Sequence, residues 1–258
     1  MAKLFENPRS IAIEGPIRAG KSTLAALLAE EIGARRIAEP DGNPFLSEFY
    51  RGERSAGFSS QMWFLMTRYE QLCAATEQDA LAEHRVPMVA DYIFEKDKIF
   101  ACLNLEDEEL ALYNRQYQYF RDQLPTPDLV IYLQASPQVL RTRIRRKGLA
   151  EERAIADGYL DQVVQAYEHF FFHYTASDLL VVNTDEIDFV ESNQDLQMLL
   201  RRMTEPVRGT QYFLPLGRRD RDCSPVRSAR RQSPTLRMLA QGFGPRIAEV
   251  AQRLKLAL

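Results

Sequence analysis

The sequence predicts an α/β fold in which a five-stranded parallel sheet is flanked by helices. Over about the first 190 residues, short apolar runs alternate with longer stretches of helical periodicity, which is typical of strands joined by crossover helices. The runs at 128–134 (DLVIYLQ) and 178–183 (DLLVVN) are almost continuously apolar, as expected for strands that helices cover on both faces. A glycine-bearing turn joins the first strand to the first helix.

The elements follow one another in the order that such a sheet requires. We expect strands at 10–14 (SIAIE), 36–39, 86–91 (VPMVAD), 128–134 and 178–183. The second strand is short and ends at Pro40, which cannot donate to a sheet ladder. We expect helices at 21–32, 57–84, 106–123, 136–148 and 151–174, where the pattern is helical rather than alternating.

Charge divides the chain into an acidic domain and a basic tail. Residues 1–216 carry 23 basic and 33 acidic side chains, whereas residues 217–258 carry 10 basic and 3 acidic ones. Residues 217–234 are polar, basic and contain proline and serine, which is typical of a flexible linker. Residues 235–258 place apolar side chains on one helical face. We therefore expect one domain at 1–216, a linker at 217–234 and a short amphipathic helix at 235–258.

The composition excludes several classes of protein. With 45% hydrophobic and 27% charged residues, the chain resembles neither a disordered nor a fibrous protein. A membrane-spanning helix needs an apolar run of about 18 residues, and no run in this chain approaches that length. The first residues also lack the basic-then-apolar pattern of a signal peptide. The three cysteines stand far apart, outside metal-binding spacings. We expect a protein of the reducing cytoplasm without a membrane span.

The turn after the first strand matches the phosphate-binding pattern GxxxxGK[ST]. Residues 15–22 read GPIRAGKS, between an apolar strand and a helix, which is the context that the pattern requires. The glycines let backbone N–H groups point at phosphate oxygens, the lysine reaches the β- and γ-phosphates, and the serine offers a hydroxyl to Mg²⁺. The sequence therefore predicts a P-loop. The residues expected to bind the triphosphate are Gly15, Arg18, Ala19, Gly20, Lys21, Ser22 and Thr23.

A P-loop alone does not identify the reaction. The Asn-Lys-x-Asp pattern of GTPases is absent from the sequence, whereas the parts that phosphoryl transfer to a small acceptor needs have candidates. Glu39 ends the second strand, at the sheet edge where ligands bind, and is a candidate base. Gln61 and Arg68 lie two helical turns apart on one face, a spacing suited to reading a planar ring. Residues 141–147 place five cations on one helix, which is typical of a lid over phosphates.

These motifs together resemble the deoxynucleoside kinase family, in particular its bacterial deoxyadenosine/deoxyguanosine kinase branch, which is related to deoxycytidine kinase. The motifs that carry the resemblance are, in order, IAIEGPIRAGKST, EPDGNPFLSEFY, QMWFLMTR, ADYIFEKDKIFA, PDLVIYLQAS, RIRRKGLAEE and VNTDEIDF. The resemblance extends from the first strand to about Pro215, and the basic tail has no counterpart in the pattern. The resemblance implies a P-loop kinase fold with a helical lid, with ATP and Mg²⁺ as cofactors.

On the acceptor side, the resemblance implies roles for individual residues. Glu39 would be the base for the nucleoside 5′-hydroxyl, and Tyr50 and Glu152 would hold the sugar 3′-hydroxyl. The same motifs place further residues at the nucleoside. Gln61 would pair with the edge of the base, and Phe100 would stack on the base. The others are Arg68, two helical turns after Gln61, and Asp91 and Asp97.

On the donor side, the resemblance places lid cations at the phosphates and a short segment at the adenine. Arg143 and Lys147 match the lid cations, and Arg143, Lys147, Lys21 and Glu39 are the expected catalytic residues. The expected border of the donor adenine is formed by Asp185, Glu186 and Ile187. Ser22 and Asp91 are the expected Mg²⁺ site, since a carboxylate after the third strand commonly serves the water shell of the metal.

Three positions depart from the family pattern. Arg18 stands where a glycine is common, and Leu149 stands where the lid usually has an arginine. The Glu-Arg-Ser that usually follows the third strand is Ala90-Asp91-Tyr92 here, so that Asp91 supplies the carboxylate and Lys96 replaces the arginine. Which of Asp91 and Asp97 faces the metal and which faces the base stays open.

The sequence thus predicts a salvage enzyme that transfers the γ-phosphoryl group of ATP to the 5′-hydroxyl of a deoxynucleoside, with purines slightly favoured. One alternative is a nucleoside monophosphate kinase of the thymidylate kinase type, which would need more cations in the acceptor pocket. The other is a P-loop regulatory protein that uses its basic tail to bind a partner. That tail suits contact with nucleic acid or with the acidic domain, and the helix at 57–84 suits a homodimer face. The base and the discrimination between ribose and deoxyribose stay open.

Overall fold

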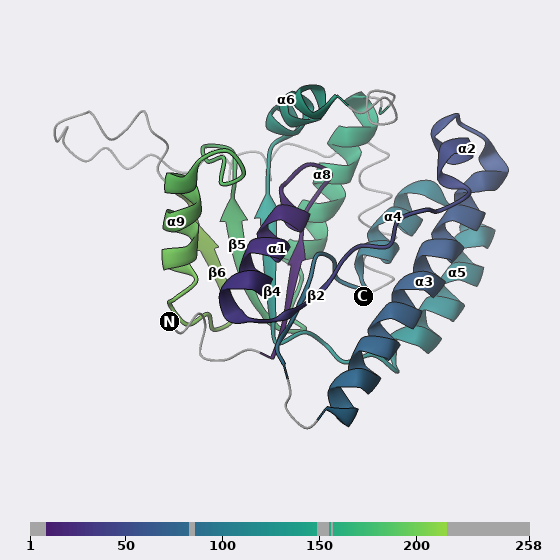
Figure 1. The fold of residues 1–258 in the computed structure, drawn as a ribbon. Coiled ribbons are helices and arrows are strands. Elements are labelled where there is room, and N and C mark those ends of the chain that lie inside the picture. Colours follow the sequence, from purple (N-terminus) through teal and green to yellow (C-terminus); the bar gives the residue numbers. More distant parts are fainter. Residues whose placement is uncertain (1–8, 83–85, 149–154, 156, 216–258) are drawn as a thin grey trace.

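A parallel sheet of six strands lies at the centre of the computed structural model, which describes residues 9–82, 86–148, 155 and 157–215 (Figure 1). The strand order is β2-β3-β1-β4-β5-β6. The strands are β1 (Ser10–Glu14), β2 (Arg35–Ile37), β3 (Met88–Ala90), β4 (Leu129–Gln134), β5 (Asp178–Asn183) and β6 (Thr210–Phe213). The predicted α/β fold is confirmed. The sixth strand, β6, was not predicted because its four residues are partly exposed and form no apolar run.

Eight helices surround the sheet in the described part of the chain. They are α1 (Lys21–Ile32), α2 (Leu46–Tyr50), α3 (Arg54–Leu81), α4 (Lys96–Asn104), α5 (Asp107–Arg121), α6 (Pro137–Lys147), α8 (Asp157–Phe172) and α9 (Asn193–Arg202). The five predicted helices are present: α1 has the predicted ends, and the other four differ at one or both ends. The short helices α2, α4 and α9 were not predicted. None of the described helices is long and apolar enough to cross a membrane.

Side chains of the central strands alternate between two cores, as strand geometry requires. On one face, Ile11 and Ile13 of β1 belong to a cluster with Leu24 of α1 and Leu199 of α9. On the other face, the cluster that contains Ala12 also takes in buried residues of α3, α4, α5 and α8. Because both faces are covered, the central strands β4 and β5 are almost continuously apolar.

The order of the strands places a crevice at the carboxyl end of β1. From β1 the chain runs to β2 and β3 on one side of the sheet, and it then crosses to β4, β5 and β6 on the other side. Ligands of open α/β sheets bind at such a reversal, beyond the carboxyl ends of the strands. The loop that follows β1, the helix pair α3 and α4, and the helix α6 all border this end of the sheet (Figure 1).

The predicted linker at 217–234 and the predicted helix at 235–258 lie outside the described residues. The division of the chain into an acidic domain and a basic tail therefore stays a prediction.

Candidate active site

The loop between β1 and α1 has the close packing that a phosphate-binding loop needs. A Cβ atom at Gly15 would lie 2.6 Å from the carbonyl oxygen of Leu133, and one at Gly20 would lie 2.6 Å from the ring of Phe189. Only glycine fits at these positions. Arg18, between them, adopts a φ of +62°, in the left-handed region where glycine is favoured. The loop therefore keeps its shape with an arginine where the family often has glycine.

Lys21 begins α1 and folds over this loop. Its Nζ donates to the carbonyl oxygens of Gly15 at 2.7 Å and Pro16 at 3.1 Å. Burial lowers the pKa of Lys21, and the nearby charge of Lys96 lowers it further. The carboxylates of Glu14, Glu39 and Asp91 oppose this change, and a bound phosphate group would oppose it further.

Two cavities meet at Lys21. The donor cavity, of about 410 Å³, follows the P-loop and is lined by Ile17, Arg18, Ala19, Gly20, Lys21, Ser22, Thr23, Glu39, Arg143, Arg146, Lys147, Asp188, Phe189, Val190 and Glu191. The acceptor cavity, of about 530 Å³, lies between α2, α3, α4 and α8. Ile17, Lys21 and Glu39 line both cavities. Both volumes lie in the range of small-molecule sites.

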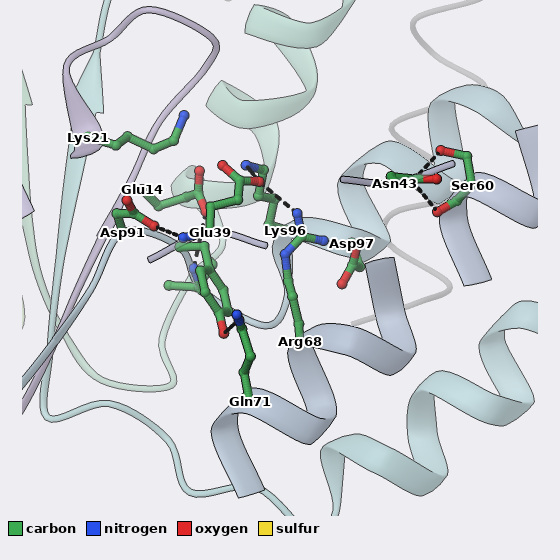
Figure 2. A network of polar contacts seen from close by, with 12 residues as sticks. Glu14, Lys21, Glu39, Asn43, Ser60, Arg68, Gln71, Asp91, Lys96 and Asp97 are labelled. Carbon is green, nitrogen blue, oxygen red and sulfur yellow. Dashed lines mark hydrogen bonds and ion pairs between the residues drawn. The ribbon is translucent and has the colours of Figure 1, made fainter. Parts of the chain in front are cut away.

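Glu39, two residues after β2, sits where the cavities join, and cations converge on it (Figure 2). Its Oε1 atom accepts from Arg68 at 2.7 Å and from Lys96. No described residue donates a hydrogen bond to Oε2. Burial alone would raise the pKa of Glu39, but the charges of Lys96, Arg68 and Lys21 outweigh it and hold the pKa well below its usual range. The carboxylate is therefore ionised at neutral pH.

Arg68 links Glu39 to Asp97 inside the protein. Its Nη2 atom donates to Glu39 and its Nη1 atom donates to Asp97, and its guanidinium lies 4.7 Å from the ring centre of Phe64. Burial lowers the pKa of Arg68, but the carboxylates of Asp97 and Glu39 outweigh this effect and raise the pKa above its ordinary value. This chain of charges fixes α3 and α4 against the end of β2.

Two helical stripes form the walls of the acceptor cavity. Gln61, Phe64 and Arg68 follow one another along α3, and Asp97, Phe100 and Asn104 follow one another along α4. Both sets repeat every three or four residues, so each lies on one helical face. Four buried atoms of these walls have no hydrogen-bond partner among the described residues: Gln61 Oε1, Arg68 Nε, Asp97 Oδ2 and Asn104 Nδ2. Buried polar atoms are normally paired, so these walls suit a polar ligand.

The structure separates Asp91 from Asp97. Asp91, directly after β3, accepts from the backbone N–H of Glu39 and from Arg36 at 3.0 Å. It therefore holds the segment that carries Glu39 and is not among the residues that line either cavity. Asp97, by contrast, lines the acceptor cavity. The predicted contact of Asp91 with a metal ion stays a prediction.

On the donor side, lid helix α6 is tied to the loop after β5. Arg143 donates to the carbonyl oxygens of Thr184 at 2.7 Å and Ile187 at 3.1 Å. Burial lowers the pKa of Arg143, while the carboxylates of Asp188 and Asp185 oppose that change. Lys147 is exposed and lines the donor cavity. Both predicted lid cations thus line the donor cavity. Arg143, in addition, anchors the loop after β5.

The segment predicted to border the adenine is displaced from the cavity. Asp185 accepts from the backbone N–H of Ser136 at 2.7 Å, and Ile187 belongs to the core. The donor cavity is lined instead by residues 188–191, which directly follow. The structure does not bring Asp185, Glu186 or Ile187 to the lining of this cavity.

The two residues expected at the sugar 3′-hydroxyl are described incompletely or not at all. Tyr50 is the last residue of α2, next to Phe49, which lines the acceptor cavity. The position of its side chain is not described, and Glu152 and Leu149 lie outside the described residues. These roles stay predictions.

Sequence reasoning missed several residues that shape the site. Glu14 is fully buried at the end of β1, where its carboxylate accepts from the backbone N–H of Gly15 at 2.8 Å and Ile93 at 3.1 Å and from Tyr167 at 3.0 Å. It thus joins the P-loop to the segment after β3. Asn104 lies seven residues after Asp97, the same spacing that pointed to Gln61 and Arg68. If α4 had been predicted, that spacing would have pointed to Asn104.

The family comparison covers most of the chain. A family model described as deoxynucleoside kinase matches residues 11–208. Deoxyguanosine kinase of Bacillus subtilis (strain 168) is 36% identical over 200 residues, which cover 76% of this chain and 96% of the relative. Deoxyadenosine kinase of Lactobacillus acidophilus is 27% identical over 213 residues, which cover 77% of this chain and 96% of the relative.

Solved structures agree with this match. Deoxyadenosine kinase from M. mycoides with bound dATP superposes with a TM-score of 0.63 at 26% identity, covering 76% of this chain and 99% of that one. The same enzyme with bound dCTP gives a TM-score of 0.60 at 25% identity, covering 75% of this chain and 97% of that one. The tail from residue 217 onward lies beyond the range that the family model matches.

Proposed function

The chain belongs to the deoxynucleoside kinase family, and on this premise we propose that it transfers the γ-phosphoryl group of ATP to the 5′-hydroxyl of a purine deoxynucleoside. The observation that carries the proposal is the meeting of the donor and acceptor cavities at Lys21 and Glu39. An acceptor hydroxyl bound at this junction would lie next to both a phosphate-binding lysine and an ionised carboxylate. The purine preference is supported by relatives named deoxyguanosine kinase and deoxyadenosine kinase.

Glu39 provides the base in this mechanism. Lys96 and Arg68 bind Oε1, so we assign Oε2 as the atom that binds the 5′-hydroxyl and accepts its proton. The two cations keep the carboxylate ionised and orient it. Because phosphoryl transfer needs little covalent help from the protein, holding the hydroxyl in line with the γ-phosphate is the main contribution of this group.

Cations of the P-loop and the lid stabilise the charge of the phosphoryl group. Lys21 exchanges its contacts with the loop carbonyls for the β- and γ-phosphates, and Lys147 closes over them from α6. Arg143 keeps α6 attached to the loop after β5 and so positions this cation. Positive charge placed in advance where negative charge is transferred is usually the largest contribution to catalysis.

The donor cavity suits a magnesium ion. The Ser22 hydroxyl lines it beside Lys21, and Mg²⁺ prefers oxygen ligands, keeps several waters and is often held by one or two side chains plus phosphates. Ser22 would hold the ion, and Asp91, whose oxygens already accept from Arg36 and Glu39, would contact it through water. When bound, the ion would neutralise phosphate charge.

We further propose that the protein is a cytoplasmic homodimer. Met66 on α3 and Leu112 and Tyr119 on α5 are exposed, and these helices pack on each other through the stacked rings of Tyr69 and Phe120. Exposed apolar side chains on two packed helices suit contact with a second copy of the chain. Cys73 forms no disulfide within the described part of the chain, as expected in a reducing compartment. The basic tail is proposed to contact the acidic domain or nucleic acid.

A coupled assay with different acceptors tests the reaction. We expect ADP release with deoxyguanosine or deoxyadenosine and little with dTMP. Besides Lys21, the described cations that line the acceptor cavity are Arg68 and Lys96, and both neutralise Glu39, so a second phosphate would find no cation of its own. Adenosine in the same series measures the discrimination between ribose and deoxyribose. Faster turnover with dTMP than with any deoxynucleoside would favour a nucleoside monophosphate kinase.

The pH dependence of kcat/KM for the nucleoside provides a second test. A base works only when ionised, and a pKa held below the ordinary carboxyl value of about 4.3 keeps Glu39 ionised down to lower pH. Since kcat/KM reports the groups of the free enzyme, we expect no loss of activity from Glu39 between about pH 8 and pH 5. ATP affinity measured over the same range is the control. An acidic limb near neutrality, without a change in ATP affinity, would contradict the described environment of Glu39.

A further inference from the structure

We propose that Asn43 is a positioning residue for the acceptor: its side-chain amide attaches residues 39–43 to Ser60 of α3 and so shapes the cavity that receives the nucleoside. This inference rests on the proposed function and concerns the same acceptor cavity. It assigns a role to a residue that is not among those expected to bind either substrate.

The side-chain amide of Asn43 makes hydrogen bonds through both of its polar atoms. Its Nδ2 atom donates to the hydroxyl oxygen of Ser60 at 2.9 Å and to the carbonyl oxygen of Ser60 at 3.2 Å (Figure 2). Its Oδ1 atom accepts from the backbone N–H of Phe45 at 3.0 Å. Ser60 is 1% exposed, so loss of the amide would leave a buried hydroxyl without this partner, which is costly. Asn43 thus joins the loop between β2 and α2 to a buried position of α3.

Residues 39–43, the 39–43 segment, are attached to α3 at both ends (Figure 2). Glu39 accepts from Arg68, and Asn43 donates to Ser60, eight residues earlier on the same helix. Eight helical residues rise about 12 Å, and four residues of extended chain span at most about 13–14 Å. The length of the segment therefore matches the spacing of its two attachments, so that it follows α3 from one to the other.

The 39–43 segment forms part of the wall of the acceptor cavity. Residues 39–43 and Ser60 all line this cavity, and Gln61, which is expected at the edge of the base, directly follows Ser60. A segment that is not attached has to be ordered when a ligand binds against it, and this ordering lowers the affinity. The Asn43 contacts therefore prepare the cavity for the nucleoside.

The catalytic carboxylate is held by other contacts. Oε1 of Glu39 accepts from Arg68 and Lys96, and the backbone N–H of Glu39 donates to Asp91. Asn43 is not among the residues that line the donor cavity. Loss of its contacts should therefore raise KM for the nucleoside much more than it changes kcat or KM for ATP.

The test uses deoxyguanosine or deoxyadenosine, whichever the wild-type protein turns over faster, and measures kcat and both KM values. Asn43→Ala should raise KM for the nucleoside about 5- to 30-fold, whereas kcat and KM for ATP should change less than about threefold. Asn43→Asp keeps the acceptor for Phe45 but removes the donor to Ser60, and it should raise the same KM by a similar factor. The matched control is Asn193→Ala, at the exposed start of α9 and outside both cavities, which should leave all three constants unchanged.

A double-mutant cycle distinguishes positioning through Ser60 from direct contact of Asn43 with the nucleoside. Ser60→Ala removes the hydroxyl partner and should raise KM for the nucleoside by a smaller factor, because the carbonyl oxygen of residue 60 remains. The double variant should behave like Asn43→Ala alone, since both changes break the same attachment. Folding is checked by circular dichroism, and Ser60→Ala keeps the test decisive if the Asn43 variants do not fold.

Four results would overturn the proposal. They are an unchanged KM for the nucleoside in the folded variants, a loss confined to kcat, an equal rise in KM for ATP, and independent effects of Asn43 and Ser60 in the cycle. Failure of the proposed function is distinguishable, because the wild-type protein would then phosphorylate neither deoxyguanosine nor deoxyadenosine.

Discussion

Replacing Glu39 with glutamine is expected to abolish phosphoryl transfer while leaving ATP binding nearly intact. The amide oxygen of glutamine can still accept from Arg68 and Lys96, so the junction of the two cavities keeps its shape. The amide cannot take up the proton of the 5′-hydroxyl, and loss of a general base typically costs about 10²- to 10⁴-fold in rate. The measurements are kcat at saturating ATP and deoxynucleoside, and ATP affinity by calorimetry.

The control for this variant is Glu108→Gln. Glu108 is an exposed residue in the first turn of α5, outside both cavities, and its replacement should not affect kcat. A near-wild-type kcat for Glu39→Gln would remove Glu39 from the catalytic machinery. A large loss of ATP affinity in that variant would show instead that Glu39 acts mainly by balancing the charge of Lys21.

Replacing Lys21 with alanine is expected to lower both ATP affinity and the rate of transfer. In the proposed mechanism Lys21 contacts the β- and γ-phosphates, and a hydrogen bond to a charged group contributes about 1.5–3 kcal/mol. We therefore expect ATP affinity to fall about 10- to 100-fold and kcat to fall at least about 100-fold. Calorimetric titration with ATP and steady-state kinetics measure the two effects separately.

Thermal unfolding distinguishes this loss from damage to the loop, because Lys21 also donates to the carbonyl oxygens of Gly15 and Pro16. Lys21→Arg should restore part of the affinity for ATP, since it keeps the positive charge. Wild-type ATP affinity in a folded Lys21→Ala protein would mean that the triphosphate is not held by this loop.

Much of the fold could be predicted from the sequence because its signals are local. The strands β1 and β5 and the helix α1 were predicted with the ends that they have, since apolar runs and glycines mark them. The P-loop was predicted for the same reason, because its pattern lies within eight consecutive residues. The spacing of Gln61 and Arg68 also indicated one helical face, and both line the acceptor cavity.

The environment of α4 could not be predicted, because it depends on residues far away in the sequence. Three consecutive charged residues at its start, 96–98, suggest an exposed segment, yet all three are buried. Lys96 pairs with Glu39, Asp97 pairs with Arg68, and the ammonium group of Lys98 lies 4.9 Å from the ring centre of Tyr117. Only the fold brings these partners together. The same pairing places Asp97 at the acceptor cavity and Asp91 outside it, whereas their roles toward metal and base stay a prediction.

Label transfer from ATP tests the central claim most directly. The wild-type protein is incubated with Mg²⁺, [γ-³²P]ATP and deoxyguanosine, and the products are separated. We predict that the label appears in the 5′-monophosphate of the deoxynucleoside, and that Glu39→Gln forms almost none of it while still binding ATP. Label that appears only in inorganic phosphate, or in no product with any deoxynucleoside, would contradict the account.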